Sequence, residues 1–125
     1  MFLQHQVSDV PLIRREIPAS IILDGVPQFH GRILSVSEDK CTAQVVWQMT
    51  KGAVVLEPDP KTNDVLYAID GKAEIRMAGQ ATQIIEPGTM IECPHSRFEI
   101  WVADHFKKIS FIYNPEGLTL KAEAL

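Results

Sequence analysis

Most of this chain consists of short runs in which apolar and polar residues alternate, each closed by Gly, Pro or Asp, and helical periodicity is nearly absent. Runs rich in Val, Ile, Thr and aromatic residues with such boundaries are typical of β-strands. Many strands at regular spacing indicate an antiparallel sandwich or barrel. We predict strands at Ile21–Leu23, Arg32–Ser37, Thr42–Met49, Ala53–Glu57, Val65–Ile69, Lys72–Met77, Ala81–Ile85, Met90–Glu92, Phe98–Val102 and Phe106–Tyr113.

Three turns are predicted between the later strands. The Asp70-Gly71 pair predicts a two-residue type I′ hairpin between its flanking strands, because both central residues of that turn need positive φ. Ala78-Gly79-Gln80 and Glu86-Pro87-Gly88 predict the next two turns.

The length of 125 residues fits one domain with a real hydrophobic core. No linker or repeat divides the chain. We predict an arm over residues 1–18, a β-barrel over residues 19–116 and a tail over residues 117–125. Arms of compact β proteins often pair with a second subunit, because an unpaired sheet edge is a liability. A homodimer is therefore expected.

Composition and charge exclude several classes of partner. The net charge is −4, and the Arg14-Arg15 and Lys107-Lys108 doublets are isolated, so we expect no nucleic-acid partner. No apolar run approaches the ~20 residues of a membrane span, and no signal peptide is visible, so no membrane partner and a cytoplasmic location are expected. Cys41 and Cys93 lack CxxC spacing and are predicted to be reduced core residues.

Strand parity groups the polar residues, because residues two apart face the same way. Glu57 and Asp59 share a face if the chain stays extended there. Asp64 shares a face with Leu66 and Ala68. In the strand RFEIWV, one face carries Arg97, Glu99 and Trp101, and the other carries Phe98, Ile100 and Val102.

The segment GKAEIRMAGQATQIIEPGTMIECPHSRFEIWV resembles the core of a cupin. Cupin motif 1 is similar to G-x5-H-x-H-x(3,4)-E-x6-G, and Asp64 and Gly71 match its last two positions. Motif 2 is similar to G-x5-P-x-G-x2-H, and Gly88 and Pro94 match its first two. The resemblance covers Val45 to Tyr113 and is closest to the ureidoglycine-aminohydrolase-type and ethanolamine-utilisation-type single-domain cupins. It implies an all-β, antiparallel jelly-roll barrel.

The chain departs from the cupin pattern at the histidines. Motif 1 allows three or four residues between its second histidine and its glutamate. With four, Glu57 and Asp59 occupy the histidine positions, and with three, Pro58 and Pro60 occupy them. Glu99 stands at the motif 2 histidine, and Ser96 replaces the second glycine of that motif. The resemblance therefore implies a cupin that lacks the usual histidine metal ligands.

Two interpretations of the four carboxylates Glu57, Asp59, Asp64 and Glu99 stay open. They could converge at the barrel mouth and bind a hard cation such as Mn²⁺, Mg²⁺ or Ca²⁺, which prefers oxygen ligands. Alternatively, Glu57 and Asp59 are solvated loop charges and Asp64 caps a turn. Glu99 then pairs with Arg97. The cofactor considered is this divalent cation (Mn²⁺, Mg²⁺ or Ca²⁺), and no other is expected. The pocket-lining candidates are Glu57, Asp59, Asp64, Arg97, Glu99 and Trp101.

Other side chains also have two interpretations. His95 could carry a proton or form rim hydrogen bonds. Arg97 could bind a substrate carboxylate or pair with Glu99 or Asp64. Trp47 and Tyr67 are predicted to lie in the core, and no residue is identified as catalytic.

Three functions remain in competition. The first is a small-molecule-binding cupin whose net acidic pocket holds a small polar metabolite, such as an amine. The second is an enzyme (amidohydrolase, lyase or isomerase) that acts on a small nitrogenous metabolite through carboxylates, with or without a divalent cation. The third is a regulatory or structural protein with a vestigial pocket.

Overall fold

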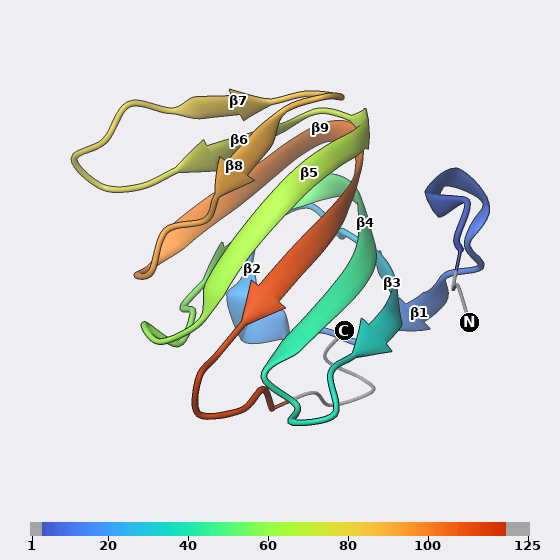
Figure 1. The fold of residues 1–125 in the computed structure, drawn as a ribbon. Helices are drawn as coiled ribbons and strands as arrows, with labels where there is room; N and C mark the ends of the chain where they lie inside the picture. Colours follow the sequence, from blue (N-terminus) through green and yellow to red (C-terminus); the bar gives the residue numbers. More distant parts are fainter. Residues whose placement is uncertain (1–3, 120–125) are drawn as a thin grey trace.

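The computed structural model describes residues 4–119, which form nine antiparallel strands and two short 3₁₀ turns (Figure 1). The turns are η1 (Val7–Asp9) and η2 (Ala19–Ile21). The strands are β1 (Ile13–Arg15), β2 (Ile22–Asp24), β3 (Phe29–Val36), β4 (Thr42–Leu56), β5 (Asn63–Gly71), β6 (Ala73–Arg76), β7 (Gln83–Ile85), β8 (Met90–Glu92) and β9 (Phe98–Tyr113).

Two long strands, β4 and β9, pair with each other along almost their whole length and belong to both layers of the fold. The first half of β4 and the second half of β9 lie in a layer with β1, β3, β5 and β8. Their other halves lie in a layer with β2, β6 and β7. The register shifts between Thr50 and Gly52, and such a bulge bends a strand without ending it. The predicted all-β jelly-roll is confirmed, with each of these strands continuous where the sequence predicted two.

The predicted Asp70-Gly71 hairpin is wrong. β5 and β6 do not pair with each other; both pair with β9, on opposite sides of its bend. Gly71 has φ +72°, but Asp70 lacks the positive φ that a type I′ turn needs. The Lys72 N–H donates instead to the His105 carbonyl oxygen, at 3.1 Å. The chain therefore passes from one layer to the other at this point.

The two later turns are confirmed. The Gln80 N–H donates to the Met77 oxygen at 3.0 Å, and the Thr89 N–H donates to the Glu86 oxygen at 2.9 Å. Gly88, with φ +91°, follows Pro87 as the residues of a type II turn require.

The first part of the chain does not stand apart from the barrel. β1 pairs with β3 of the same chain, with Ile13 opposite Gly31 (Figure 1). The segment predicted as an arm therefore contributes an edge strand. In the predicted tail, the Leu118 N–H donates to the Lys40 oxygen at 2.8 Å, and residues 120–125 lie outside the described residues.

The core lies between the layers and contains Phe106, Met49 and Leu66 among its fully buried side chains. Cys93 is buried and Cys41 is half-buried, and both are free, as predicted. Burial, followed by the nearby charge of Asp64, raises the pKa of the Cys93 thiol to about 12.

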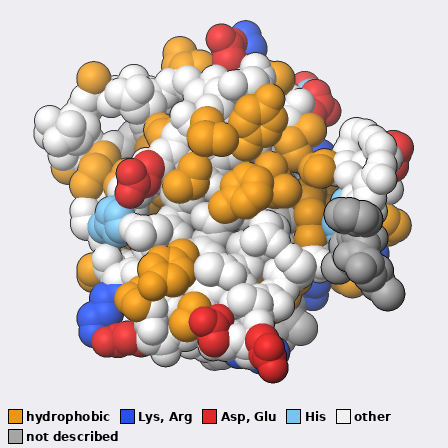
Figure 2. Space-filling view, viewed as in Figure 1, with side chains coloured by type: hydrophobic (Ala, Val, Ile, Leu, Met, Phe, Trp, Pro, Cys, Tyr) orange, Lys and Arg blue, Asp and Glu red, His pale blue; other side chains and the backbone are white. Residues whose placement is uncertain are grey.

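Apolar side chains also gather on the outer face of the first layer, over β5 and the C-terminal part of β9 (Figure 2). The exposed ones include Tyr67, Met90, Phe111 and Tyr113. Tyr67 was predicted in the core, but it is 39% exposed because its parity is opposite to that of Leu66. The homodimer stays a prediction. None of the helices within residues 4–119 is long and apolar enough to cross a membrane.

His105, at the bend of β9, provides a pH-dependent contact. Its Nδ1 lies 2.9 Å from Asp104 Oδ2 and its Nε2 lies 3.3 Å from Asp70 Oδ2. Hydrogen bonding to Asp104, then to Asp70, raises the pKa of His105 above its ordinary 6.5. The contribution of this contact to stability should be fully present below pH 6.5 and disappear as pH rises through the folded-state pKa.

We expect NMR titration of the His105 ring to give a midpoint above 6.5, and Asp104→Asn to lower that midpoint. Glu38→Gln, in the exposed turn between β3 and β4, is the control and should leave the midpoint unchanged. A wild-type midpoint at or below 6.5 would contradict the prediction.

Candidate functional site

A cavity of about 290 Å³ opens between the two layers. The segment from Arg15 to Pro18 lines it, together with Ile21. Three polar side chains reach its wall: Asp64 from β5, and Lys108 and Ser110 from β9. The rest of the wall is apolar and consists of Phe29, Val45, Trp47, Leu56, Ile100 and Ile112.

Lys108 is the most unusual residue of this wall. The alternation of β9 turns it inward together with Phe106 and Ser110, and it is only 9% exposed. Its Nζ donates to Ser110 Oγ at 2.6 Å and lies 5.0 Å from the centre of the Trp47 ring. Within residues 4–119, no carboxylate oxygen lies within 4.0 Å of Lys108 Nζ, so this lysine has no ion-pair partner there. A buried ammonium is almost always paired, so this arrangement is uncommon.

Lys108 was not among the predicted site residues, because the Lys107-Lys108 doublet was considered only as an isolated pair of charges in the argument against a nucleic-acid partner. The signal was present in KKISFIY: parity places Lys108, Ser110 and Ile112 on one face, and Lys107 on the other. Lys107 does face away, and its Nζ donates to the Ser8 carbonyl oxygen at 3.1 Å.

Asp64 brings an unpaired acceptor into the same cavity. It lies in β5 on the face that also carries the buried Leu66 and Ala68, opposite Ile112 in register. Its side-chain Oδ1 is buried and has no hydrogen-bond partner within the described chain. Its backbone oxygen accepts from the Cys93 N–H at 2.8 Å. A buried acceptor without a partner normally costs free energy, which makes this oxygen available to a ligand.

The charges of the cavity are mixed. In the segment before β2, the Arg15 Nε is buried and lacks a partner within residues 4–119, while Glu16 is exposed and its Oε1 lies 3.9 Å from Arg14 Nε. Two cations and two carboxylates therefore line the cavity. The net acidic pocket expected from the sequence is not what the structure shows, because the chemistry of Lys108 and Arg15 was not included.

The acidic loop after β4 forms another pocket, of about 260 Å³. Glu57, Asp59 and Asp64 all line it, so the structure brings these three predicted residues to one place. Glu57 accepts from Arg97 Nη1 at 2.6 Å, in a pair of which both side chains are more than 60% exposed. Arg97 therefore pairs with Glu57, and not with Glu99 or Asp64 as predicted. An exposed ion pair of this kind contributes little to stability.

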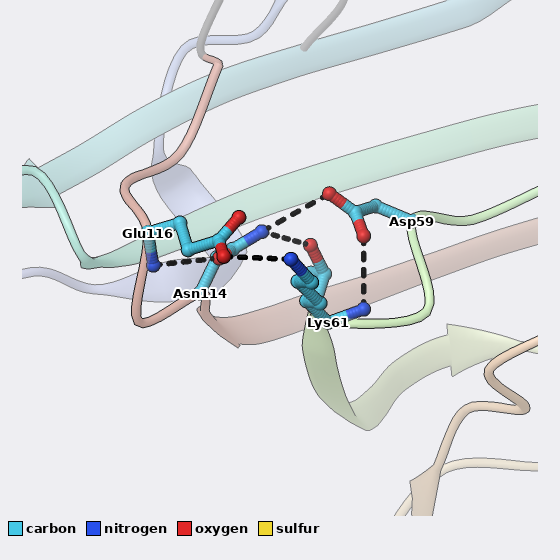
Figure 3. A network of polar contacts seen from close by, with 5 residues as sticks. Asp59, Lys61, Asn114 and Glu116 are labelled. Atoms are coloured by element: carbon cyan, nitrogen blue, oxygen red, sulfur yellow. Dashed lines mark hydrogen bonds and ion pairs between the residues drawn. The ribbon is translucent and has the colours of Figure 1, made fainter.

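Asp59 has a structural role in this loop (Figure 3). Its Oδ1 accepts from the Lys61 N–H at 2.9 Å, and its Oδ2 accepts from Asn114 Nδ2 at 3.2 Å. Asn114 Nδ2 also donates to Thr62 Oγ1 at 3.1 Å, and Asn114 Oδ1 accepts from the Glu116 N–H at 2.9 Å. Asn114 is only 4% exposed, so it ties the acidic loop to the turn after β9.

Asn114→Ala should lower the free energy of unfolding by about 1–2 kcal/mol, because it removes these hydrogen bonds from a buried position. Chemical denaturation measures the change. Glu116→Gln is the matched control: it weakens only the exposed Lys61–Glu116 pair at 2.6 Å and should change stability by less than about 0.5 kcal/mol. Equal losses in the two variants would contradict the role given to Asn114.

Glu99 and Trp101 do not line the interior cavity. The inward face of this part of β9 carries the buried Phe98, Ile100 and Val102. On the outer face, Trp101 Nε1 donates to Glu99 Oε1 at 2.8 Å, and the Arg76 guanidinium lies 4.2 Å from the centre of the Trp101 ring. Trp101 lines a separate pocket of about 370 Å³ with Glu74 and Arg76, apart from the acidic-loop residues with which it was predicted. Parity groups residues without saying which face is inside.

The four predicted carboxylates therefore do not converge, since Glu99 lies on the outer face. Among residues 4–119, no group of three or more His, Cys, Asp or Glu side chains is placed to hold a metal ion. These residues do not fit the metal centre of an ordinary cupin. His95 is partly exposed, with Nδ1 3.1 Å from the Pro60 oxygen and Nε2 3.5 Å from Glu92 Oε1.

Comparison with known proteins identifies structures that share the fold of this chain. No protein-family model and no curated protein sequence matches the chain. Among solved structures, the EutQ protein of Clostridium difficile is 18% identical, with a TM-score of 0.63 over 85% of this chain and 97% of that one. The cupin domain of Schizosaccharomyces pombe Cnp3 is 12% identical, with a TM-score of 0.66 over 90% and 74%. Ectoine synthase from P. lautus is 18% identical, with a TM-score of 0.64 over 94% and 80%. These likenesses show the cupin fold.

Proposed function

We propose that this cupin-fold chain is a small-molecule-binding protein that holds a small polar metabolite in its interior cavity, without a histidine-bound metal. One observation carries the proposal: Lys108 is nine-tenths buried in an apolar wall, with Ser110 as its only hydrogen-bond partner among the described residues.

The energetics of that lysine support a binding role. Burying an ammonium without a carboxylate partner costs free energy, and proteins accept such costs mainly at functional sites. Asp64 adds a buried acceptor without a partner to the same wall. The cavity volume of about 290 Å³ is at the lower end of the ~300–1,000 Å³ of small-molecule pockets, which favours a ligand of few atoms.

The test is a thermal-melt screen of the purified protein against a panel of small cationic, neutral and anionic metabolites. We expect at least one class to raise the melting temperature, because a ligand that binds only the folded state stabilises it. Lys108→Met should abolish the rise, and Lys107→Met, which removes the outward-facing neighbour, should keep it. If no compound of any class shifts the melting temperature at millimolar concentration, the proposal fails and the vestigial pocket is favoured.

Asp64 favours an enzyme as the second candidate. Its unpaired Oδ1 could act as a general base on a ligand bound in the cavity. An enzyme should convert the bound compound to a product detectable by mass spectrometry, and Asp64→Asn should stop conversion while binding persists. A ligand recovered unchanged after prolonged incubation would leave the binding function alone.

A further inference from the structure

We infer that the ligand of the interior cavity is a small organic monocarboxylate with an apolar body and one hydrogen-bond donor, held by Lys108 at its carboxylate and by Asp64 at its donor. This inference rests on the proposed function and names the chemical class that the site would take.

The contacts of Lys108 indicate that the ligand carries a carboxylate. An ammonium has three N–H donors and no acceptor. One N–H reaches Ser110 Oγ at 2.6 Å, and the Trp47 ring, whose centre is 5.0 Å from Nζ, offers a cation–π contact. Neither partner carries a negative charge. A ligand carboxylate would supply both the missing charge and the missing acceptors.

A second donor belongs to the lining of the cavity. The Arg15 Nε is buried and has no partner within residues 4–119. Lys108 and Arg15 are therefore both cations of the lining, whereas the exposed Glu16 can stay in solvent. This favours one negative group on the ligand and argues against the amine-only ligand suggested by the sequence.

The apolar body follows from the rest of the wall. Leu56, Phe29 and Ile100 line the cavity without a polar side-chain atom, and Trp47 adds only its indole N–H, which is a donor. This part of the wall therefore offers no acceptor to a further donor of the ligand. A short branched or cyclic hydrocarbon would fill this space and gain free energy from burial.

The donor follows from Asp64. Its buried Oδ1 accepts no hydrogen bond within the described chain, so a hydroxyl, amide or ammonium hydrogen of the ligand would satisfy it. A hydroxy acid or an amino acid combines such a donor with a carboxylate and an apolar side chain.

Four compounds with the same branched carbon skeleton test the inference by calorimetry and thermal melts: leucic acid, leucine, isocaproate, which lacks the donor, and leucinol, which lacks the carboxylate. We expect leucic acid or leucine to bind about tenfold more tightly than isocaproate, and leucinol not to bind. Lys108→Met should abolish binding of every carboxylate. Asp64→Leu should remove the advantage over isocaproate without abolishing isocaproate binding.

The possible outcomes separate the inference from the proposed function. Binding of leucinol or of other cationic or neutral compounds, with no carboxylate bound, would overturn the inference and leave the proposed function standing. Inorganic phosphate that binds as tightly as leucic acid would overturn the choice of a carboxylate. Failure of every compound in the wider metabolite panel would overturn both.

Discussion

The Lys108→Met variant should unfold at a higher denaturant concentration than the wild-type protein when no ligand is present. We expect the free energy of unfolding to rise by about 1–3 kcal/mol, because methionine fills a similar volume without burying a charge. The loss of the Ser110 hydrogen bond and the Trp47 contact offsets part of this gain. Chemical denaturation of the two proteins under the same conditions measures the difference.

The same variant should no longer be stabilised by ligand, so its stability and its binding should change in opposite directions. This opposition is expected where a residue is kept for function at the expense of stability. Lys107→Met is the control, because that side chain lies outside the cavity and contacts the Ser8 carbonyl oxygen. A clear loss of stability in Lys108→Met would show that the lysine is a structural residue and would weaken the case for a binding site.

A methyl group at Gly71 is expected to cost about 3 kcal/mol or more of folding free energy. A Cβ at this position would lie 2.0 Å from the His105 carbonyl oxygen and 2.7 Å from its carbon, both of them backbone atoms. The φ of +72° adds the penalty of a left-handed conformation, about 1 kcal/mol. Relief would require β5 to separate from β9 where the chain passes between the layers.

Gly79→Ala separates the two contributions. Gly79 has φ +76°, but nothing lies within 4 Å of a Cβ built there, so this variant should lose only the conformational part, about 1 kcal/mol. Denaturation of both variants measures the difference. Equal losses would mean that the close approach of His105 to Gly71 does not constrain the fold.

The fold could be predicted from the sequence because strands and turns are local features. The two-residue alternation, the glycines after Ala78 and Pro87, and the spacing of Gly88 and Pro94 all depend on neighbours in the chain. The Asp70-Gly71 turn could not be predicted in this way. Its local signal favours a hairpin, but β5 and β6 pair with successive stretches of β9 and not with each other. Pairing partners more than twenty residues away leave no trace in a turn dipeptide.

The site shows the same division. Alternation along each strand is enough to tell which residues share a face: Lys108 with Ser110, Asp64 with Leu66, and Glu99 with Trp101. Which of these faces is inside depends on the folded molecule, because the bend of β4 and β9 turns one face of each strand toward the opposite layer. That choice placed a lysine and an aspartate in the cavity and left a glutamate and a tryptophan outside. Periodicity depends on local backbone geometry, whereas burial depends on how two layers pack, and residues far apart in the chain determine that packing.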